Sequence, residues 1–273
     1  MDLVPFDKRS GKIWHNGKLV DWKEANLHIL SHGLHYASCV FEGERVYNGE
    51  IFKLREHTNR LIYSADRMGM KIPYSAEQID NACKEIIFAQ SVQNGYVRPV
   101  VWRGSEMMAI SAQKSKIHLA IATWEWGSYF DPQIKIKGIR LDISKWKKPP
   151  PDCIPWDTKA SGLYMISTLS KHEAEKKSYH DALMMDYQGN IAEADSFLDG
   201  ITRRSIIEIA KQLQIKVLER KIKLDELNTF DGCFLTGTAA EVTPVSQIGD
   251  IKFSVVDIIK KLDDNYSKLV NKN

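Results

Sequence analysis

The sequence predicts a two-domain protein of mixed α/β (α+β) structure, and three observations lead to this prediction. A chain of 273 residues with 43% hydrophobic content can bury one large core or two ordinary ones. Segments with the two-residue alternation of β-strands and segments with the 3.6-residue period of helices both recur along the chain. The stretch Trp124 to Asp131 mixes aromatic residues with glycine. We therefore expect a small N-terminal domain at 1–126, a connection at 127–136 and a large C-terminal domain at 137–273.

The first half predicts two hairpins and two helices. Asn16-Gly17 and Asn48-Gly49 each lie between two short runs of β-forming residues, and both dipeptides tolerate positive φ. Apolar residues at helical spacing follow Leu54, and Ser31–Gly43 is expected to be a loop that runs into a strand. The expected elements are hairpins at 12–20 and 45–52, helices from 54 and at 76–90, and strands at 96–102 and 116–124.

The second half opens with a strand-like pattern and a loop rich in proline. Four prolines between Pro149 and Pro155 fix φ and remove backbone donors, so this loop should be extended. An amphipathic helix is expected to begin near Ser161 or Gly162. The further expected elements are strands at 134–144, 182–185, 215–219 and 234–241, a helix after Gly200, and a C-terminal helix at 256–269.

Composition excludes several classes of protein. The net charge of +3 is spread along the chain, so we expect no nucleic-acid partner. No apolar run approaches the length of a membrane span, and no apolar signal segment begins the chain. The four cysteines are far apart, which favours reduced thiols and a cytoplasmic location. His28, His32 and His35 form no ligand pattern with a nearby acidic residue or cysteine, so we expect no metal site.

Several residues would together suit a phosphorylated aromatic aldehyde as ligand. Lys159 offers an amine at the start of a helix, and Glu193 offers a carboxylate for a ring nitrogen. The helix start at Gly200–Thr202 could bind a phosphate, together with Arg60. Arg60 could equally pair with Glu56, four residues earlier. Each residue is ordinary when it is taken singly, and only their joint occurrence has weight.

Six motifs, in order, resemble those of branched-chain amino-acid aminotransferases, which are fold-type IV enzymes that depend on pyridoxal 5'-phosphate (PLP). The resemblance extends from about residue 10 to the C-terminus. The motifs are His35–Gly43, Arg55–Leu61, Tyr96–Pro99, Lys159–Tyr164, Gly200–Arg203 and Gly237–Pro244.

The resemblance implies a two-domain fold like that of D-amino-acid aminotransferase and a role for each matching residue. Lys159 would be the catalytic lysine that forms a Schiff base with PLP. The other cofactor-binding residues would be Arg60, Tyr164, Glu193, Leu198, Ile201, Thr202 and Thr238. The substrate would be bound by Tyr36, Phe41, Gly43, Tyr96, Arg98, Tyr129, Thr238 and Ala239, part of them from the partner subunit of a homodimer or higher oligomer.

The resemblance also implies the reaction, which is reversible transamination of leucine, isoleucine or valine with 2-oxoglutarate. Alternatives on the same fold are a D-amino-acid aminotransferase and an aminodeoxychorismate lyase. The connection from Glu193 to Gly200 is about twenty residues shorter than the family pattern, roughly a two-stranded hairpin. An inactive, truncated PLP-binding protein is therefore a further alternative. We interpret the short connection as residues missing from the numbering, because the flanking motifs retain their site residues.

Overall fold

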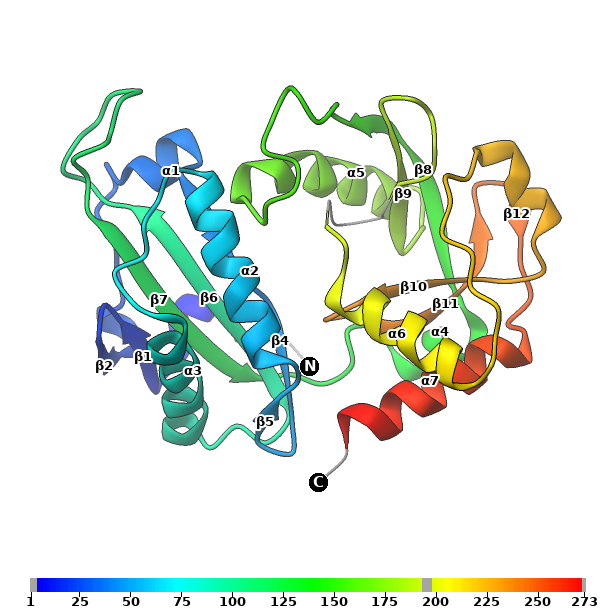
Figure 1. Ribbon diagram of the computed structural model, residues 1–273, viewed down its shortest axis with the longest axis horizontal. Helices are drawn as coiled ribbons and strands as arrows, with labels where there is room; N and C mark the ends of the chain where they lie inside the picture. The colour runs from blue at the N-terminus through cyan, green and yellow to red at the C-terminus, as the bar shows by residue number, and fades with distance from the viewer. Residues whose placement is uncertain (1–3, 193–197, 272–273) are drawn as a thin grey trace. The chain divides into compact units, whose positions relative to one another are not determined.

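The structure is a computed structural model that describes residues 4–192 and 198–271. Two compact units are present, and Figure 1 shows their elements. The first unit comprises Met1–Gly127 and Thr158–Gly162, and the second comprises Ser128–Asp157 and Leu163–Asn273. The segment Thr158–Gly162 belongs to the first unit because its backbone pairs with that unit: Phe41 N–H donates to Lys159 C=O at 3.1 Å.

An antiparallel sheet forms the centre of the first unit. Both hairpins are confirmed, and Asn16 and Asn48 take φ of 48° and 51°, as Asn-Gly turns require. Leu119, Ile121 and Thr123 alternate as buried residues along one strand, as predicted. The order of its described strands is β2 (Lys18–Asp21), β1 (Lys12–His15), β7 (Ile117–Glu125), β6 (Gly95–Arg103), β4 (Glu44–Tyr47) and β5 (Glu50–Ile51), and β3 (Cys39–Phe41) pairs with β6.

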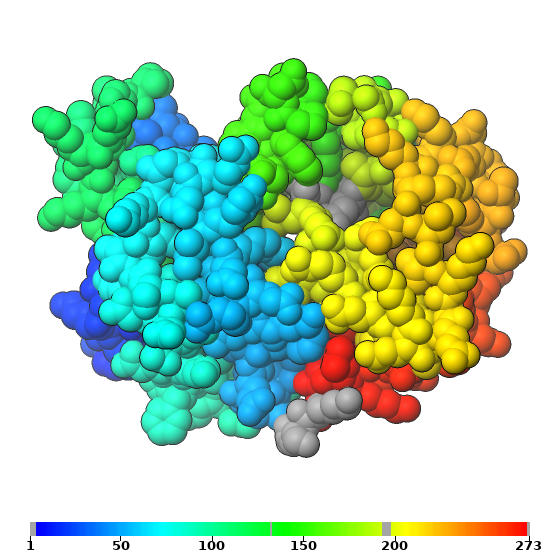
Figure 2. Space-filling view, viewed as in Figure 1, coloured from blue at the N-terminus to red at the C-terminus, as the bar shows by residue number. Residues whose placement is uncertain are grey.

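Two helices pack on this sheet. α2 (Leu54–Arg67) and α3 (Ala76–Gln90) confirm the predicted helices, and a capping box of Ser75 and Gln78 begins α3. Leu61, Ile79 and Ile86 are fully buried on their inner faces. In Figure 2, side chains of these two helices, in blue and cyan, cover the visible face of the unit and hide most of the sheet. α2 packs against β3 and α3.

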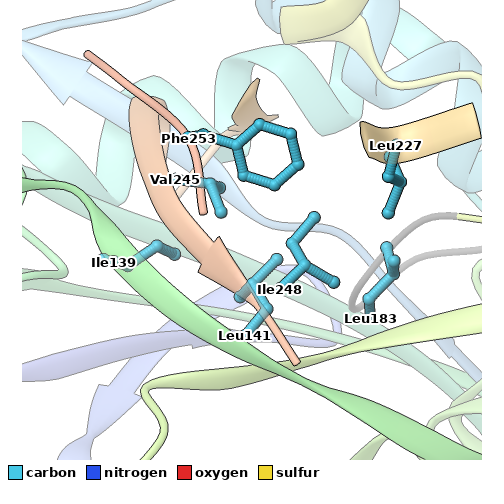
Figure 3. Close-up of a cluster of buried hydrophobic side chains, with 7 residues drawn as sticks. All are labelled: Ile139, Leu141, Leu183, Leu227, Val245, Ile248 and Phe253. Carbon is cyan, nitrogen blue, oxygen red and sulfur yellow. The ribbon is translucent and has the colours of Figure 1, made fainter. Parts of the chain in front are cut away.

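The second unit is built on a mixed sheet. β8 (Ile139–Lys148) pairs in parallel with β9 (Asp181–Asp186) and β11 (Glu241–Ile248). β10 (Cys233–Gly237) and β12 (Ile251–Lys252) pair antiparallel with β11. α5 (Tyr164–Lys176) packs on β8 and β9, α6 (Ile201–Gln212) on β10, and α7 (Asp257–Val270) on α6 and β11. Figure 3 shows a buried apolar cluster of this unit, which is formed by Ile139 and Leu141 of β8, Leu183 of β9, Val245 and Ile248 of β11, and Leu227 and Phe253.

The structure corrects three sequence predictions. Residues 132–137 form a helix, α4 (Pro132–Lys137), because proline occupies its first turn and the Asp131 carboxylate accepts the Gln133 N–H; the strand begins only at Ile139. Residues 215–219 form no strand, since they have no ladder partner among the described residues. Gly33, which was expected in a loop, lies inside the short helix α1 (His32–Tyr36).

Short 3-10 helices complete the described elements, and they are η1 (Phe6–Lys8), η2 (Trp22–Glu24), η3 (Ser161–Leu163) and η4 (Leu224–Thr229). No helix in the described ranges has both the length and the apolar content that a membrane crossing needs.

Candidate active site

Lys159 is fixed at the edge of the first unit by its backbone. Its N–H donates to Ser64 Oγ at 3.0 Å, and its C=O accepts from Phe41 N–H. Ser64 is fully buried on α2, so the backbone of the reactive segment is joined both to this helix and to β3. The side chain extends over the Phe41 ring, with Nζ 5.0 Å from the ring centroid.

Phe41 is also the platform for Arg98. The Arg98 guanidinium carbon lies 4.6 Å from the Phe41 centroid, and Nη2 donates to Tyr96 Oη at 3.3 Å. The buried Arg98 Nε has no hydrogen-bond partner in the part of the chain that the structure describes. A cation with an unused, buried donor is well suited to a carboxylate ligand.

Gly43 completes this group because it leaves room for Tyr96. A Cβ atom at residue 43 would lie 1.8 Å from Tyr96 Oη, so no other residue fits without movement. The structure thus brings together five of the predicted residues within one unit, namely Phe41, Gly43, Tyr96, Arg98 and Lys159.

Arg60 forms a two-point ion pair with Glu42. Arg60 Nε and Nη2 donate to Glu42 Oε1 and Oε2 at 2.6 and 2.9 Å, and His57 Nδ1 lies 2.8 Å from Oε2. The Glu42 side chain is fully buried. Glu56, the alternative partner from the sequence, pairs with Lys53 at 3.2 Å.

The protonation states of this cluster follow from its geometry. Burial opposes ionisation of Glu42, yet the Arg60 guanidinium and the His57 hydrogen bond hold the pKa of its carboxyl well below the ordinary value. Burial lowers the pKa of His57, and the charges of Arg60 and Lys159 lower it further although Glu42 opposes them. At neutral pH the carboxylate is therefore ionised and the imidazole is neutral. Since an ionised carboxylate only accepts, His57 Nδ1 is the donor.

The second unit contains the other predicted cofactor residues. α6 begins at Ile201 with Gly200 as its N-cap, which confirms the predicted helix start, and Ile201 and Thr202 are both buried. Leu198 is buried just before this helix, and Tyr164 is the first residue of α5. Thr238 and Ala239 lie in the turn between β10 and β11.

The remaining predicted site residues are Tyr36, Tyr129 and Glu193. Tyr36 is 41% exposed at the end of α1, with its ring 4.6 Å from that of His32. Tyr129 packs against Phe130 in the second unit. Glu193 lies outside the described residues. Within the described ranges, no three His, Cys, Asp or Glu side chains are grouped as metal ligands.

Sequence reasoning missed Glu42, His57 and Ser64 as parts of the site. His57, Arg60 and Ser64 follow one another at helical spacing beside the buried Leu61 and Ala65. Polar residues on the inner face of a helix are rare unless they have a partner, and this signal could have identified His57 and Ser64. Glu42 shows no helical spacing of this kind, because it lies in the irregular segment between two strands.

Comparison with known proteins supports one family. The model of the class IV amino-transferases matches residues 39–197 and 194–248. A probable branched-chain-amino-acid aminotransferase of Rickettsia conorii is 40% identical over 99% of both chains. The branched-chain amino acid aminotransferase of Escherichia coli superposes with a TM-score of 0.92 at 30% identity, over 97% of both chains. The enzyme designated T.th., complexed with N-(5'-phosphopyridoxyl)-L-glutamate, gives 0.91 at 34% identity, over 96% of this chain and 95% of that one.

The comparisons also bear on the short connection after Glu193. The two parts of the family match meet at residues 194–197, and the Rickettsia conorii alignment spans 292 positions, more than the 273 residues of this chain. The relatives therefore contain residues that this chain lacks. The sequence continues without a break from Glu193 to Gly200, so our interpretation that residues were missing from the numbering is wrong. With its core motifs, fold and near full-length similarity, the chain belongs to the branched-chain-amino-acid aminotransferases within the class IV aminotransferase family.

Proposed function

We propose that this protein is a PLP-dependent aminotransferase that transfers the amino group of leucine, isoleucine or valine to 2-oxoglutarate. One observation supports this most strongly: the Lys159 amine and the Arg98 guanidinium lie over the same Phe41 ring, at 5.0 and 4.6 Å from its centroid. A nucleophilic amine and a carboxylate-binding cation beside an apolar surface are what transamination of an apolar amino acid requires.

The residues fit PLP by their chemistry. Lys159 offers the amine for its aldehyde, and Arg60 is a cation on the inner face of α2. The N-terminus of α6, with Gly200, Ile201 and Thr202, offers backbone N–H groups to a phosphate, and Thr238 offers a hydroxyl. We assign Tyr164, Leu198 and Glu193 to the cofactor ring from the family resemblance.

When bound, PLP supplies an aldehyde carbon that condenses with amines and a ring that accepts electrons. Lys159 Nζ would then act as the base that removes the proton from the α-carbon of the amino acid, and it would return a proton in the reverse half. The hydrogen bonds from Lys159 N–H to Ser64 and from Phe41 N–H to the Lys159 C=O fix the backbone from which this amine extends.

Arg98 would allow the site to accept both an apolar substrate and glutamate. Its guanidinium contacts Phe41 and Tyr96, so an aliphatic side chain meets aromatic surface while a distal carboxylate meets the cation. The T.th. relative has been seen with a phosphopyridoxyl derivative of L-glutamate. Arg98→Gln should raise KM for glutamate about tenfold or more and change KM for leucine less, because charge-assisted hydrogen bonds contribute about 1.5–3 kcal/mol. Equal changes for both substrates would refute this role.

A homodimer is the proposed assembly, and the cytoplasm is the proposed location. Leu27, Ile29 and Leu34 expose 54–68% of their surface within one short stretch that ends at the exposed Tyr36. Apolar side chains gathered in this way favour an interface, from which Tyr36 would serve the partner's pocket. Light scattering should give at least twice the 31.2 kDa of one chain. All four cysteines are free thiols, as in reducing compartments.

Loss of the lysine tests the chemistry. Lys159→Ala should abolish the absorbance band of lysine-linked PLP, leaving that of the free aldehyde, and the covalent trapping of PLP by borohydride. Lys145→Ala, at a lysine that pairs with Glu173 on the surface, is the control and should retain both. A borohydride-stable adduct on the Lys159→Ala protein would reject the assignment.

Substrate assays separate the alternatives on this fold. We expect turnover of L-leucine with 2-oxoglutarate and none of D-alanine. Turnover of D-alanine alone would indicate a D-amino-acid aminotransferase, and release of pyruvate from aminodeoxychorismate would indicate the lyase.

A further inference from the structure

The carboxylate of Glu42 has an unusual place in the first unit. It is fully buried, and three donors surround it: Arg60 Nε at 2.6 Å, Arg60 Nη2 at 2.9 Å and His57 Nδ1 at 2.8 Å. The Gly43 N–H adds a fourth contact at 3.2 Å. A buried charge with this many donors is costly to assemble and is retained only where its partners are well placed.

The backbone of Glu42 is as firmly fixed as its side chain. Its N–H donates to Pro99 C=O on β6 at 2.9 Å. Its neighbours on either side are Phe41, which lies under Lys159, and Gly43, which packs against Tyr96. Glu42 therefore connects α2 to β6: its side chain pairs with Arg60 of α2, and its backbone is hydrogen-bonded to Pro99 of β6.

A second buried carboxyl, Glu44, has different surroundings from Glu42. Glu44 is buried, and neither of its oxygens has a hydrogen-bond partner among the described residues. Burial raises the pKa of Glu44 well above its ordinary value, and the charges of Glu42 and Asp80 raise it further. The two pKa shifts have opposite directions, so Glu42 is the more readily ionised of the two carboxyls.

We propose that Glu42 is a positioning residue which, with His57 as its support, fixes the Arg60 guanidinium in one orientation for binding the phosphate of the cofactor. The two-point contact takes Nε and one hydrogen of Nη2, and it directs the plane of the guanidinium. The inference rests on the proposed function, since it deepens the role assigned there to Arg60.

The direction in which Glu42→Gln changes the affinity for phosphate distinguishes orientation of Arg60 from neutralisation of its charge. If Glu42 merely neutralised Arg60, Glu42→Gln would leave an extra positive charge and tighten binding of a phosphate. If Glu42 orients Arg60, the same variant would lose one ionic partner of the guanidinium and weaken phosphate binding. The expected loss is about tenfold in affinity, as for one charge-assisted hydrogen bond.

The experiment compares PLP with pyridoxal, which has the same ring and aldehyde but no phosphate. Equilibrium affinities for the two are measured on apoprotein by absorbance, for the unaltered protein, Glu42→Gln and a control. Asp80→Asn is the matched control, because Asp80 is also a buried carboxylate that pairs with an arginine of α2, Arg55 Nε, at 2.7 Å. We expect Glu42→Gln to weaken PLP about tenfold and leave pyridoxal unchanged, and Asp80→Asn to leave the ratio of the two affinities unchanged.

Three results would overturn the inference: tighter PLP binding by Glu42→Gln, unchanged PLP binding, or an equal loss for PLP and pyridoxal. Should Glu42→Gln fail to fold, the same two affinities are measured on Arg60→Lys. Lysine keeps the positive charge but cannot form the two-point contact with Glu42. A phosphate-dependent affinity retained in Arg60→Lys would refute the role of orientation, and its loss would support it. If the unaltered protein bound PLP and pyridoxal equally, the phosphate site itself, and with it the proposed function, would fail.

Discussion

Gly43→Ala tests whether the close packing of Tyr96 shapes the substrate pocket. The added Cβ would lie 1.8 Å from Tyr96 Oη and 2.7 Å from Cζ, whereas non-bonded heavy atoms prefer about 3.5–4.0 Å. The Tyr96 ring would therefore have to retreat by more than about 1 Å. It has little room to do so, because it is buried and packs against Trp124 and Trp126 at 5.3 and 4.7 Å between centroids.

Gly43→Ala should lower both the stability of the protein and its activity. Overpacking of this kind destabilises a protein by about 1–3 kcal/mol. Displacement of Tyr96 also moves the hydroxyl that accepts from Arg98, and a misplacement near 1 Å lowers the rate about 100-fold. Thermal unfolding gives the first quantity, and kcat/KM for leucine gives the second. PLP affinity should change little, since the contacts of Tyr96 are with Arg98 and the two tryptophans rather than with the residues assigned to the phosphate.

Two further variants complete this test. Gly127→Ala is the control, because no atom lies within 4 Å of the Cβ that it would add. Tyr96→Phe in the Gly43→Ala background removes the closest atom and should restore part of the stability. A Gly43→Ala protein with unaltered unfolding temperature and unaltered kcat/KM would refute the packing argument.

The remaining predictions concern buried polar groups. Burial raises the pKa of Glu44 in the folded state, whereas in the unfolded chain this carboxyl ionises above pH ~4.3. Its contribution to stability should therefore fall by about 1.4 kcal/mol per pH unit as the pH rises between the unfolded and the folded pKa. Glu44→Gln lacks this slope, and urea unfolding should show its advantage growing with pH; parallel curves would contradict us. Ser64→Ala leaves the Lys159 N–H without its acceptor, so it should lower the free energy of unfolding by about 1–3 kcal/mol and slow the covalent attachment of PLP. Ser64→Thr keeps the hydroxyl and should retain more of the stability and more of the attachment rate.

The sequence predicted the regular elements of the first unit well because their signals are local. Asn-Gly turns at 16–17 and 48–49 need positive φ, and the apolar period of α2 and α3 matches their buried faces. The errors arose where tertiary or positional effects decide. The run Ile134–Lys137 alternates isoleucine and lysine like a strand, but Asp131 and the proline after it begin a helix there. Residues 215–219 have strand-forming side chains but no partner strand among the described residues.

The candidate site was predictable only in part, for the same reason. Lys159 and Arg98 were found from their motifs, and the structure brings both to Phe41. The partner of Arg60 was not predicted, because Glu42 is 18 residues earlier and contacts Arg60 only when α2 folds onto the strands. Pairing rules for helices relate residues three or four positions apart and suggested Glu56 instead.

The short connection after Glu193 leaves a choice between an active aminotransferase and an inactive protein that binds the cofactor. Both flanks of the connection are anchored within the second unit: Ala192 N–H donates to Met184 C=O at 2.9 Å, and Leu198 is buried ahead of α6. The residues assigned to the phosphate and the amine lie outside the connection, so its shortness does not remove them. Mixing the PLP-loaded protein with leucine alone decides between the two, since an active enzyme releases one equivalent of 2-oxo acid per site in a single half-reaction. We expect that release; a protein that is yellow, is trapped by borohydride at Lys159 and yet releases no 2-oxo acid would be the inactive alternative.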